Sequence, residues 1–557
     1  MKLNGGNIVC EVLLEHGVDT VFGYPGGAAL NLYDALYGYQ GKIRHVLTAH
    51  EQGASHAADG YARASGKTGV VFATSGPGAT NLVTGIAAAF MDSVPMVAIT
   101  SNVASSLIGR DAFQEIYITG VTLPITKHNF FVNRADGLAH ALRESFRIAN
   151  TGRKGPVLID ITKNATAESC EFEPMAPYTV AELPKAADWE VQEVADLINK
   201  SERPAIYFGG GATASGAGGG LVALAEKADI PAAHTIMAAG VIGSENKRNL
   251  GLIGMHGTVA ANMAIDNADL VIALGTRFSD RVALNMEKFA KRAKLVQVDI
   301  DRSEINKNVS VDVSVISDVK YFLEKLLPLV EERRRPERLA AIDSWKEKYR
   351  VEKDADSDSA GVIKPHQLIG RICDMTDKET IYVTDVGQHQ MWAAQYIKHK
   401  NTNSFLTSAG LGAMGYGYGA SIGAQMAFPG KRVVHITGDG SFHMNMSEAC
   451  TAVSNRLPII SVIFNNRVLG MVYQWQNAFY GGRLSATVPE RVTDFAKIAE
   501  GFGARGFRAN TLGEFESAFA AALKENGPSW IECSIDREEK VLPMIPNGAT
   551  VEDIILE

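Results

Sequence analysis

Two oxygen-bearing side chains follow what we predict to be neighbouring parallel strands. Asp439 lies in the turn Gly438-Asp439-Gly440, directly after the apolar run "RVVHIT". Asn466 ends the next apolar run, "LPIISVIFNN", 27 positions after Asp439. A carboxylate oxygen, an amide oxygen and a backbone carbonyl from Arg467-Val468, for which Val468 is the candidate, would form with two phosphate oxygens and a water the octahedral set that Mg²⁺ prefers. The sequence therefore predicts a site for a cation that binds a phosphate group.

A helix is expected to begin near Ser441, and its first N–H groups would point towards the same phosphate. An ordinary hairpin turn or helix cap is the alternative, because Asp-Gly turns are common. The helix-like segment after the turn and the position of Asn466 at the end of the next strand favour the cation site.

The elements around these residues indicate an α/β protein. Short β-branched runs alternate with amphipathic segments, which is typical of parallel sheets covered by helices. Nineteen positions separate Gly76 from Pro95 and twenty separate Gly438 from Pro458, and similar strand sequences flank both pairs. These segments are interpreted as two copies of one unit, and a third α/β unit lies between them. With 557 residues, the chain is long enough for about three domains.

We expect three doubly wound parallel-sheet domains. Their predicted ranges are 1–166, 190–345 and 362–540, followed by a tail at 541–557. A Pro- and Glu-containing segment separates the first two, and the charged stretch "EKYRVEKDADSDSAG", residues 347–361, is predicted to be a solvated linker.

The composition favours an enzyme that acts on metabolites. Hydrophobic residues make up 46% of the chain and charged residues 21%, with a net charge of -8. Without a long Lys/Arg block, nucleic acid and anionic membrane are disfavoured as partners. The sequence shows neither a signal-peptide pattern nor an apolar run long enough to span a bilayer, so we expect a cytoplasmic protein. The five cysteines have no metal-ligand or redox spacing, and we expect no disulfides.

A carboxylate in the first unit, Glu51, is a second candidate functional residue. In "LTAHEQGASHAADGYARASG" a predicted strand ends at His50-Glu51 and a helix follows. Alone, Glu51 would be an ordinary helix-start carboxylate. The GDG turn with a strand-ending Asn-Asn is, however, similar to the motif of thiamine diphosphate enzymes, a family that also requires a glutamate in its first α/β unit. The resemblance implies that Glu51 hydrogen-bonds the cofactor's aminopyrimidine and so promotes deprotonation of the thiazolium C2.

Within that superfamily the chain resembles the catalytic subunits of acetohydroxyacid synthases, also called acetolactate synthases. The resemblance extends over some 530 residues and rests on these strings, in order: "VFGYPGGAALNLYDAL", "HEQGASHAADGYARASGKTGVVFATSGPGATNLVTGIA", "SLIGRDAFQE", "PITKHNF", "GMHGT", "GTRFSDRV", "DVGQHQMWAAQ", "GLGAMGYGYGASIGAQ", "MVYQWQ" and "VLPMIPNGA". It implies a first domain that binds the thiamine pyrimidine, a central FAD-binding-like domain, and a last domain that binds thiamine diphosphate and Mg²⁺.

The resemblance also implies roles for individual residues. Those expected to bind thiamine diphosphate are Gly387, Gln388, His389, Gly412, Met414, Gly438, Gly440, Ser441 and Met471, with Met414 between the cofactor's two rings. Those expected on the substrate side are Gly27, Ala28, Phe113, Gln114, Lys127, Arg281 and Trp475. Arg281 would bind the carboxylate of a second 2-oxo acid, and Trp475 would select its alkyl chain. Their alternatives are a surface ion pair with Asp280 for Arg281 and core packing for Trp475.

The middle unit resembles the family's FAD-binding domain, in which the flavin takes no part in net redox chemistry. The matching residues are Arg153, Gly210, Gly254, Met255, His256, Gly257, Arg277, Asp299 and Asp301. Gly-rich strand ends are weak evidence by themselves.

The resulting prediction is an acetolactate synthase that uses thiamine diphosphate, Mg²⁺ and a non-redox FAD. It would convert two pyruvates, or pyruvate and 2-oxobutyrate, to 2-acetolactate or 2-aceto-2-hydroxybutyrate. The family implies at least a homodimer, or a homotetramer, with Glu51 of one chain facing Asp439 of another; a regulatory small subunit is a further partner that it allows. The rivals are a thiamine-dependent pyruvate oxidase or decarboxylase, a flavin electron carrier, and a metabolite-binding regulator that would give Glu51 no role.

Overall fold

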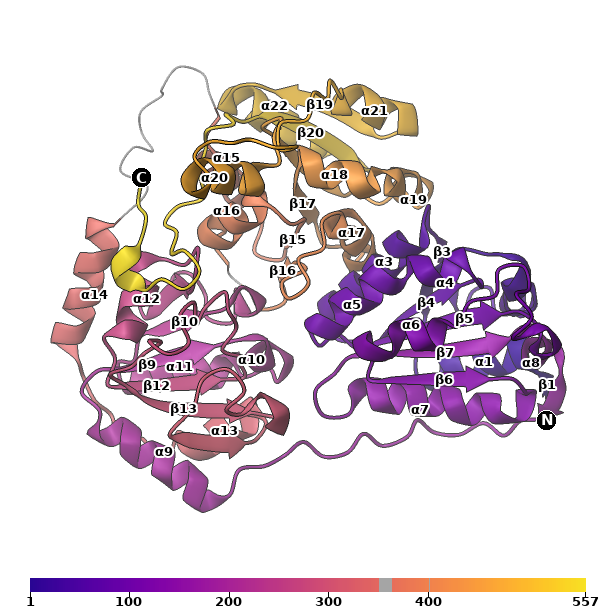
Figure 1. Cartoon of the computed structure of the whole chain (residues 1–557), viewed down its shortest axis with the longest axis horizontal. Helices are drawn as coiled ribbons and strands as arrows, with labels where there is room; N and C mark the ends of the chain where they lie inside the picture. Colours follow the sequence, from indigo (N-terminus) through magenta and orange to yellow (C-terminus); the bar gives the residue numbers. More distant parts are fainter. Residues whose placement is uncertain (350–362, 400) are drawn as a thin grey trace.

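The computed structural model describes residues 1–349, 363–399 and 401–557. Figure 1 shows three α/β units around a common centre: the first unit in indigo, the middle unit in magenta and the last unit in orange. Residues 350–361 of the predicted linker, and residue 362 at the predicted start of the last domain, lie outside the described part of the chain.

The first and last units contain sheets of the same topology. The first sheet has the strand order β3-β2-β4-β5-β7-β6 and the last has β16-β15-β17-β18-β20-β19, and all neighbours are parallel. Each order therefore runs second, first, third, fourth, sixth, fifth along the chain, which confirms the predicted duplication. The strands are β2 (Thr20–Gly23), β3 (Arg44–Leu47), β4 (Gly69–Ala73), β5 (Met96–Asn102), β6 (His128–Val132), β7 (Pro156–Thr162), β15 (Ile381–Thr384), β16 (Phe405–Leu406), β17 (Val433–Gly438), β18 (Ile460–Asn465), β19 (Arg505–Ala509) and β20 (Ser529–Ser534).

The middle unit has a different parallel sheet, with the order β11-β10-β9-β12-β13-β14. This is the third-second-first-fourth-fifth-sixth order of dinucleotide-binding folds, in which ligands bind where the strand order reverses. Its strands are β9 (Pro204–Phe208), β10 (Ala232–His234), β11 (Asn249–Leu252), β12 (Leu270–Leu274), β13 (Lys294–Asp299) and β14 (Val313–Ile316). The predicted class, three doubly wound parallel-sheet units, is thereby confirmed.

Amphipathic helices cover the sheets. In α7, for example, Leu138, Leu142 and Phe146 recur at helical spacing and are buried. The principal helices are α1 (Gly5–Glu15), α2 (Leu30–Tyr37), α3 (Glu51–Ser65), α5 (Val83–Met91), α7 (Leu138–Asn150), α9 (Asp188–Lys200), α11 (Gly218–Lys227), α12 (Val259–Asp266), α13 (Val319–Leu326), α14 (Pro336–Lys348), α15 (Pro365–Met375), α16 (Gln388–Tyr396), α17 (Tyr416–Ala427), α20 (Gly470–Phe479), α21 (Phe495–Phe502) and α22 (Leu512–Ala522). Shorter ones are α4 (Pro77–Asn81), α6 (Ile118–Thr122), α8 (Lys163–Ala167), α10 (Gly210–Ala214), α18 (Asp439–Asn445) and α19 (Ala449–Ser454). An antiparallel pair, β1 (Lys2–Asn4) and β8 (Ser169–Glu171), joins the chain start to the end of the first unit.

The first and last units of the chain pack through α3 and α17, which lie side by side in Figure 1. Small residues allow this approach: a Cβ on Gly423 would lie 1.9 Å from the carbonyl oxygen of Ala57, and one on Gly60 would lie 2.2 Å from that of Ala420. The two helices share one hydrophobic core with both sheets. The relative position of the two units is therefore set by backbone contact, which tolerates little movement.

Two further features concern the chain as a whole. The segment after β20 returns to the middle unit, where the N–H of Ile545 donates to the carbonyl of Met255 at 2.8 Å. Each described helix is too short or too polar to cross a membrane.

Candidate active site

A cavity of about 1510 Å³ lies where the three units meet. The first unit contributes residues 91–93 and 152–154, and the last contributes residues 386–392 and 438–441 at the carboxyl ends of β15 and β17. The middle unit contributes the strand ends of β9, β12 and β13. Ligands of parallel sheets bind at such carboxyl ends, and the volume is large enough for more than one small molecule.

Two strand ends enclose the ring of His389. A Cβ on Gly387, where φ is 154°, would lie 2.8 Å from its Cε1, and a Cβ on Gly438 would lie 2.8 Å from its Nδ1. Burial lowers the pKa of His389 to about 4, so the imidazole is neutral at pH 7. Its Nε2 is buried and has no hydrogen-bond partner among the described residues. The cavity wall thus contains a neutral ring nitrogen that can pair with a ligand.

The predicted cation-binding pair lies at the same sheet edge. Strands β17 and β18 are parallel neighbours with Gly438 opposite Phe464, so Asp439 and Asn466 both follow the ends of adjacent strands. Asn466 donates through Nδ2 to Oε1 of Gln388 at 3.1 Å, and its amide oxygen accepts the N–H of Val468 at 3.3 Å.

Burial raises the pKa of Asp439 to about 6, and backbone N–H groups, including that of Asn466, oppose this rise. A buried carboxylate with a raised pKa would be stabilised by a bound cation. Helix α18 begins at Asp439, two residues before the predicted start near Ser441, because a carboxylate is favoured in the first turn of a helix. The described residues contain no cluster of three or more His, Cys, Asp or Glu suited to a metal, so a cation here would combine Asp439 with neutral oxygens.

A glycine-rich loop between β16 and α17 forms another wall and contains Gly412 and Met414. Gly412 and Gly415 have φ of 69° and 83°, a conformation that favours glycine. The N–H of Gly415 donates to the hydroxyl of Ser441 at 3.0 Å. The loop is thereby attached to the turn that bears Asp439.

The middle unit forms the other half of the cavity. A Cβ on Gly211 would lie 2.7 Å from Gly275 Cα, so β9 and β12 approach closely at their carboxyl ends. Asp299 is buried at the end of β13, and burial raises its pKa to about 6. Arg153, from the first unit, donates to Glu304 at 2.8 Å and so links the two units beside the cavity.

Two residues expected on the substrate side lie at the rim. Trp475, on α20, is partly buried, and its ring contacts that of Phe479 edge-on with centroids 5.5 Å apart. Arg281 lines the cavity with 60% of its side chain exposed. It lies 3.7 Å from the Asp280 carboxylate, the pairing that we considered as its alternative.

The Glu51 carboxylate does not line this cavity. It is buried in the first unit, where Oε2 accepts a hydrogen bond from Asn81 at 2.9 Å and a Cβ on Gly78 would lie 3.1 Å from Oε1. The turn before it is held from the last unit: Glu448 accepts the backbone N–H groups of Ala49 and His50 at 3.2 and 3.1 Å. Glu51 is therefore buried between α3 and α4 of the first unit, apart from the cavity.

Four other expected substrate residues also belong to the first unit and lie outside the cavity lining. Gln114 has a φ of 62° and packs against Gly76, whose added Cβ would lie 2.8 Å from Gln114 Cβ. Gly27 and Ala28 form the turn η1 (Gly27–Ala29), and Phe113 is 87% exposed.

The comparisons with known proteins agree with this arrangement. Three family models match in order: the N-terminal TPP binding domain of thiamine pyrophosphate enzymes over residues 3–121, the central domain over 191–326, and the C-terminal TPP binding domain over 385–533. The chain is 42% identical to a probable acetolactate synthase large subunit of Methanocaldococcus jannaschii, covering 99% of this chain and 95% of that protein.

Two further relatives carry the name acetolactate synthase large subunit. That of Parasynechococcus marenigrum is 42% identical, covering 98% of this chain and 90% of its own, and that of Haemophilus influenzae is 38% identical, covering 100% and 98%. The chain belongs to the acetolactate synthase large-subunit family of thiamine pyrophosphate enzymes. Its N- and C-terminal TPP binding domains are the duplicated first and last units.

In this member of the family, the cavity gathers most of the predicted residues. Those that line it are Arg153, Gly210, Met255, His256, Arg277, Arg281, Asp299, Gly387, Gln388, His389, Gly412, Met414, Gly438, Asp439, Gly440, Ser441, Asn466, Val468, Met471 and Trp475. Those outside its lining are Gly27, Ala28, Glu51, Phe113, Gln114, Lys127, Gly254, Gly257 and Asp301. Lys127 donates instead to the carbonyl of Thr151 at 2.6 Å, near the end of α7, and burial lowers its pKa to about 8.

Sequence reasoning missed two acidic residues near the site. Glu448 holds the turn before Glu51, and Asp92 lines the cavity just after α5. Asp92 directly follows α5, and Glu448 directly precedes α19. Neither has a turn motif or a paired acid beside it, so no local pattern distinguishes either from an ordinary carboxylate at a helix terminus.

Proposed function

We propose that the chain is the catalytic subunit of an acetolactate synthase. It decarboxylates pyruvate and joins the remaining two-carbon unit to a second 2-oxo acid. The acceptor is pyruvate, which gives 2-acetolactate, or 2-oxobutyrate, which gives 2-aceto-2-hydroxybutyrate. These are early steps towards branched-chain amino acids. The observation that carries the proposal is that Asp439 and Asn466 lie together at the carboxyl ends of adjacent strands and line the cavity. The chain is also similar over 98% of its length to a protein named acetolactate synthase large subunit.

Mg²⁺ is proposed to bind Asp439, Asn466 and the carbonyl of Val468. The donor set suits it, because all three supply oxygen and Asp439 is a buried carboxylate with a raised pKa. The diphosphate is proposed to lie beside the unpaired Nε2 of His389, whose ring packs against Gly387 and Gly438. When bound, thiamine diphosphate supplies a carbon nucleophile and accepts the electrons released with CO₂.

The chain's own residues would then have distinct tasks. Met414, at the cavity wall, would contact the bound cofactor. Trp475 and the apolar part of the cavity exclude water and contact the acceptor's alkyl group. Arg281 binds the acceptor's carboxylate with its planar guanidinium, which its exposed position at the rim allows.

The proposed enzyme works as a dimer or higher oligomer. Glu51 is outside its own chain's cavity, so a second copy would have to bring it to Asp439 and the cofactor's pyrimidine. Apolar side chains are exposed on both units that would meet. On the first unit they are Tyr24, Leu30, Leu107, Ile108, Phe113, Tyr117, Val121 and Leu123, and on the last unit Leu411, Met444, Val472, Tyr480, Leu484 and Val492. Exposed apolar area of this extent is typical of a subunit interface.

FAD is proposed to bind the middle unit in a role without net redox change. The strand order is that of dinucleotide-binding folds, glycines line the ends of β9 and β12, and Nδ1 of His256 is buried without a partner among the described residues. Because the relatives are called large subunits, a regulatory small subunit is a further proposed partner.

One assay tests this function against its rivals. Products are measured from pyruvate alone and from pyruvate with 2-oxobutyrate, with thiamine diphosphate, Mg²⁺ and FAD omitted in turn. We expect the two acetohydroxy acids, with strict dependence on thiamine diphosphate and Mg²⁺. Acetaldehyde or acetyl phosphate as the main product would favour a decarboxylase or oxidase, and bleaching of the flavin by pyruvate would favour an electron carrier.

A further inference from the structure

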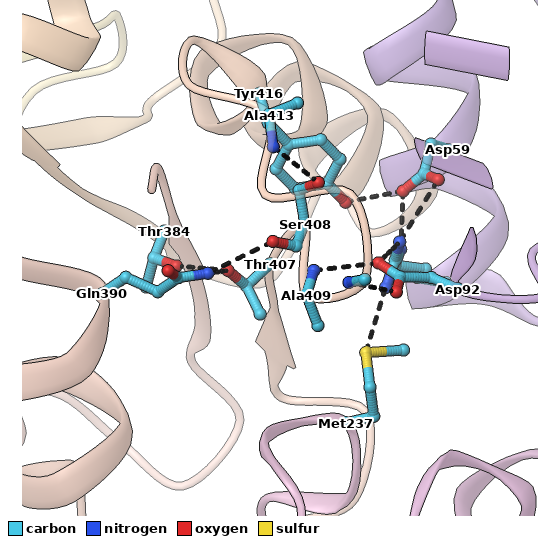
Figure 2. A network of polar contacts seen from close by, with 12 residues as sticks. Asp59, Asp92, Met237, Thr384, Gln390, Thr407, Ser408, Ala409, Ala413 and Tyr416 are labelled. Atoms are coloured by element: carbon cyan, nitrogen blue, oxygen red, sulfur yellow. Dashed lines mark hydrogen bonds and ion pairs between the residues drawn. The ribbon is translucent and has the colours of Figure 1, made fainter. Parts of the chain in front are cut away.

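A buried ionic cluster connects the first unit to the loop that contains Gly412 and Met414. Figure 2 shows Asp59 and Asp92 of the first unit facing Ala409 and Tyr416 of the last. Arg63 lies between the two carboxylates, donating through Nε to Asp59 at 2.6 Å and through Nη2 to Asp92 at 2.8 Å. Both carboxylates are completely buried as side chains, so these are charge-assisted contacts in a low-dielectric site.

The cluster holds both ends of the loop. At its start, Oδ1 of Asp92 accepts the N–H of Gly410 at 2.7 Å and Oδ2 accepts that of Ala409 at 3.0 Å. At its end, the hydroxyl of Tyr416 donates to Asp59 at 2.6 Å. The residues between these anchors include Gly412 and Met414, which line the cavity.

The turn that contains Asp92 is itself held from the middle unit. Ser93 has a φ of 61°, a strained conformation for a residue other than glycine. Its hydroxyl accepts a hydrogen bond from Arg153 at 2.8 Å, and Arg153 also donates to Glu304 of the middle unit at 2.8 Å. On the other side, Arg63 contacts the sulfur of Met237 at 3.7 Å. Residues 91–93 are thus fixed between the other two units.

We propose that Asp92 is a positioning residue: by accepting two backbone N–H groups it fixes the loop 409–415 so that Met414 projects into the cavity. Arg63 orients the Asp92 carboxylate towards the loop and ties it to Asp59 at the loop's other end. Asp92 therefore acts through Met414 and takes part in no chemical step. The effect on the cofactor rests on the proposed function, whereas the effect on the loop does not.

The first experiment is amide hydrogen exchange of residues 409–415 in the full-length protein without cofactor. Asp92→Asn keeps the shape of the side chain but replaces one acceptor oxygen by an NH₂ group that faces a donor. We expect exchange at Ala409 and Gly410 to become about tenfold to hundredfold faster, since hydrogen bonds to a charged group are lost. Unchanged exchange in this loop would overturn the proposal.

Glu15→Gln is the matched control. Glu15 is also a buried carboxylate of the first unit that pairs with an arginine, Arg143 at 2.8 Å, and accepts a backbone N–H, that of Met175. It does not line the cavity. We expect this variant to destabilise the protein without faster exchange in the loop, and equal acceleration in both variants would overturn a specific role for Asp92.

The second readout is the apparent Kd of thiamine diphosphate at saturating Mg²⁺. We expect Asp92→Asn to raise this Kd about tenfold. KM for pyruvate should change less than kcat, because the residue that is displaced, Met414, is proposed to contact the cofactor and not pyruvate. If the wild-type protein binds no thiamine diphosphate, the proposed function fails while the exchange result still decides the role of Asp92. If exchange accelerates but the Kd is unchanged, the positioning of Met414 is refuted.

A second variant tests the proposal if Asp92→Asn does not fold. Arg63→Lys keeps the positive charge but has one nitrogen in place of the guanidinium that reaches both Asp59 and Asp92. We expect a smaller acceleration of exchange in the loop. Exchange equal to that of the wild type would overturn the proposal.

Discussion

Replacement of Trp475 by leucine would show whether the ring forms a wall of the acceptor pocket or only packs in the core. The ring lines the cavity and is only partly buried, and its Nε1 has no hydrogen-bond partner among the described residues. If the ring contacts the acceptor, the extra methylene of 2-oxobutyrate gains about 1 to 3 kcal/mol over pyruvate in an apolar pocket. That range corresponds to a preference of about fivefold to more than a hundredfold, and Trp475→Leu should reduce it while acetolactate formation from pyruvate continues.

The stability cost should be modest. Truncation of a fully buried tryptophan to alanine costs about 3 to 5 kcal/mol, and a partly exposed ring replaced by leucine should cost about 1 to 2 kcal/mol. Phe479→Leu is the matched control, because Phe479 contacts the Trp475 ring but does not line the cavity. The assay is competition between 2-oxobutyrate and pyruvate at fixed total 2-oxo acid, beside a thermal melt. An unchanged product ratio with a lowered melting temperature would refute the pocket role and assign Trp475 to packing.

Four further outcomes are expected. Glu51→Gln should retain bound thiamine diphosphate but lose most turnover, because the cation and phosphate contacts lie elsewhere; undiminished exchange of the C2 proton, measured by NMR, would refute this role. Asp439→Ala should lose cofactor and Mg²⁺ together after gel filtration, because a hard cation loses its charged ligand; normal retention would contradict the metal assignment. Mixing these two inactive variants should restore activity at sites where both groups are intact, and no recovery despite proven subunit exchange would argue against a shared site. Burial raises the pKa of Asp160 to about 6 despite hydrogen bonds from Thr100 and Asn102, so this group should lower folding stability by up to about 3 kcal/mol as pH rises from about 4 to about 6, after which its effect levels off. Asp299 and Asp439, whose pKa values burial also raises to about 6, add to the slope over the same range. In Asp160→Asn the fall in stability should therefore become smaller by up to about 3 kcal/mol, and an unchanged pH slope would show that Asp160 does not contribute to it.

The parts of the site that could be predicted from the sequence are those with local signals. Parallel strands place their carboxyl ends at one sheet edge, so a Gly-Asp-Gly turn after one strand and an Asn-Asn pair after the next predict that Asp439 and Asn466 meet. The duplication of the first and last units could also be predicted, because the spacing from the turn glycine to the proline before the next strand is nearly the same in both. Both identically ordered sheets follow from it.

The remaining contacts join residues far apart in the chain. Asp59 bonds Tyr416, and Glu448 bonds Ala49 and His50, across a helix pair whose packing depends on small residues such as Gly60 and Gly423. No periodicity or turn motif encodes which helix end meets which loop. The same reason applies to Lys127, whose amine donates to the carbonyls of Ile148 and Thr151 at the end of α7 and does not reach the cavity.

The most direct test of the central claim is carbon NMR of the products formed from pyruvate labelled with carbon-13 at C2. Carboligation joins C2 of one pyruvate to C2 of another, so acetolactate would contain two adjacent labelled carbons and show their one-bond coupling. Our account predicts this coupled pair as the main signal, in wild-type protein supplied with thiamine diphosphate and Mg²⁺ and not in Asp439→Ala. A product with a single uncoupled label, such as acetaldehyde, acetate or acetyl phosphate, would contradict it.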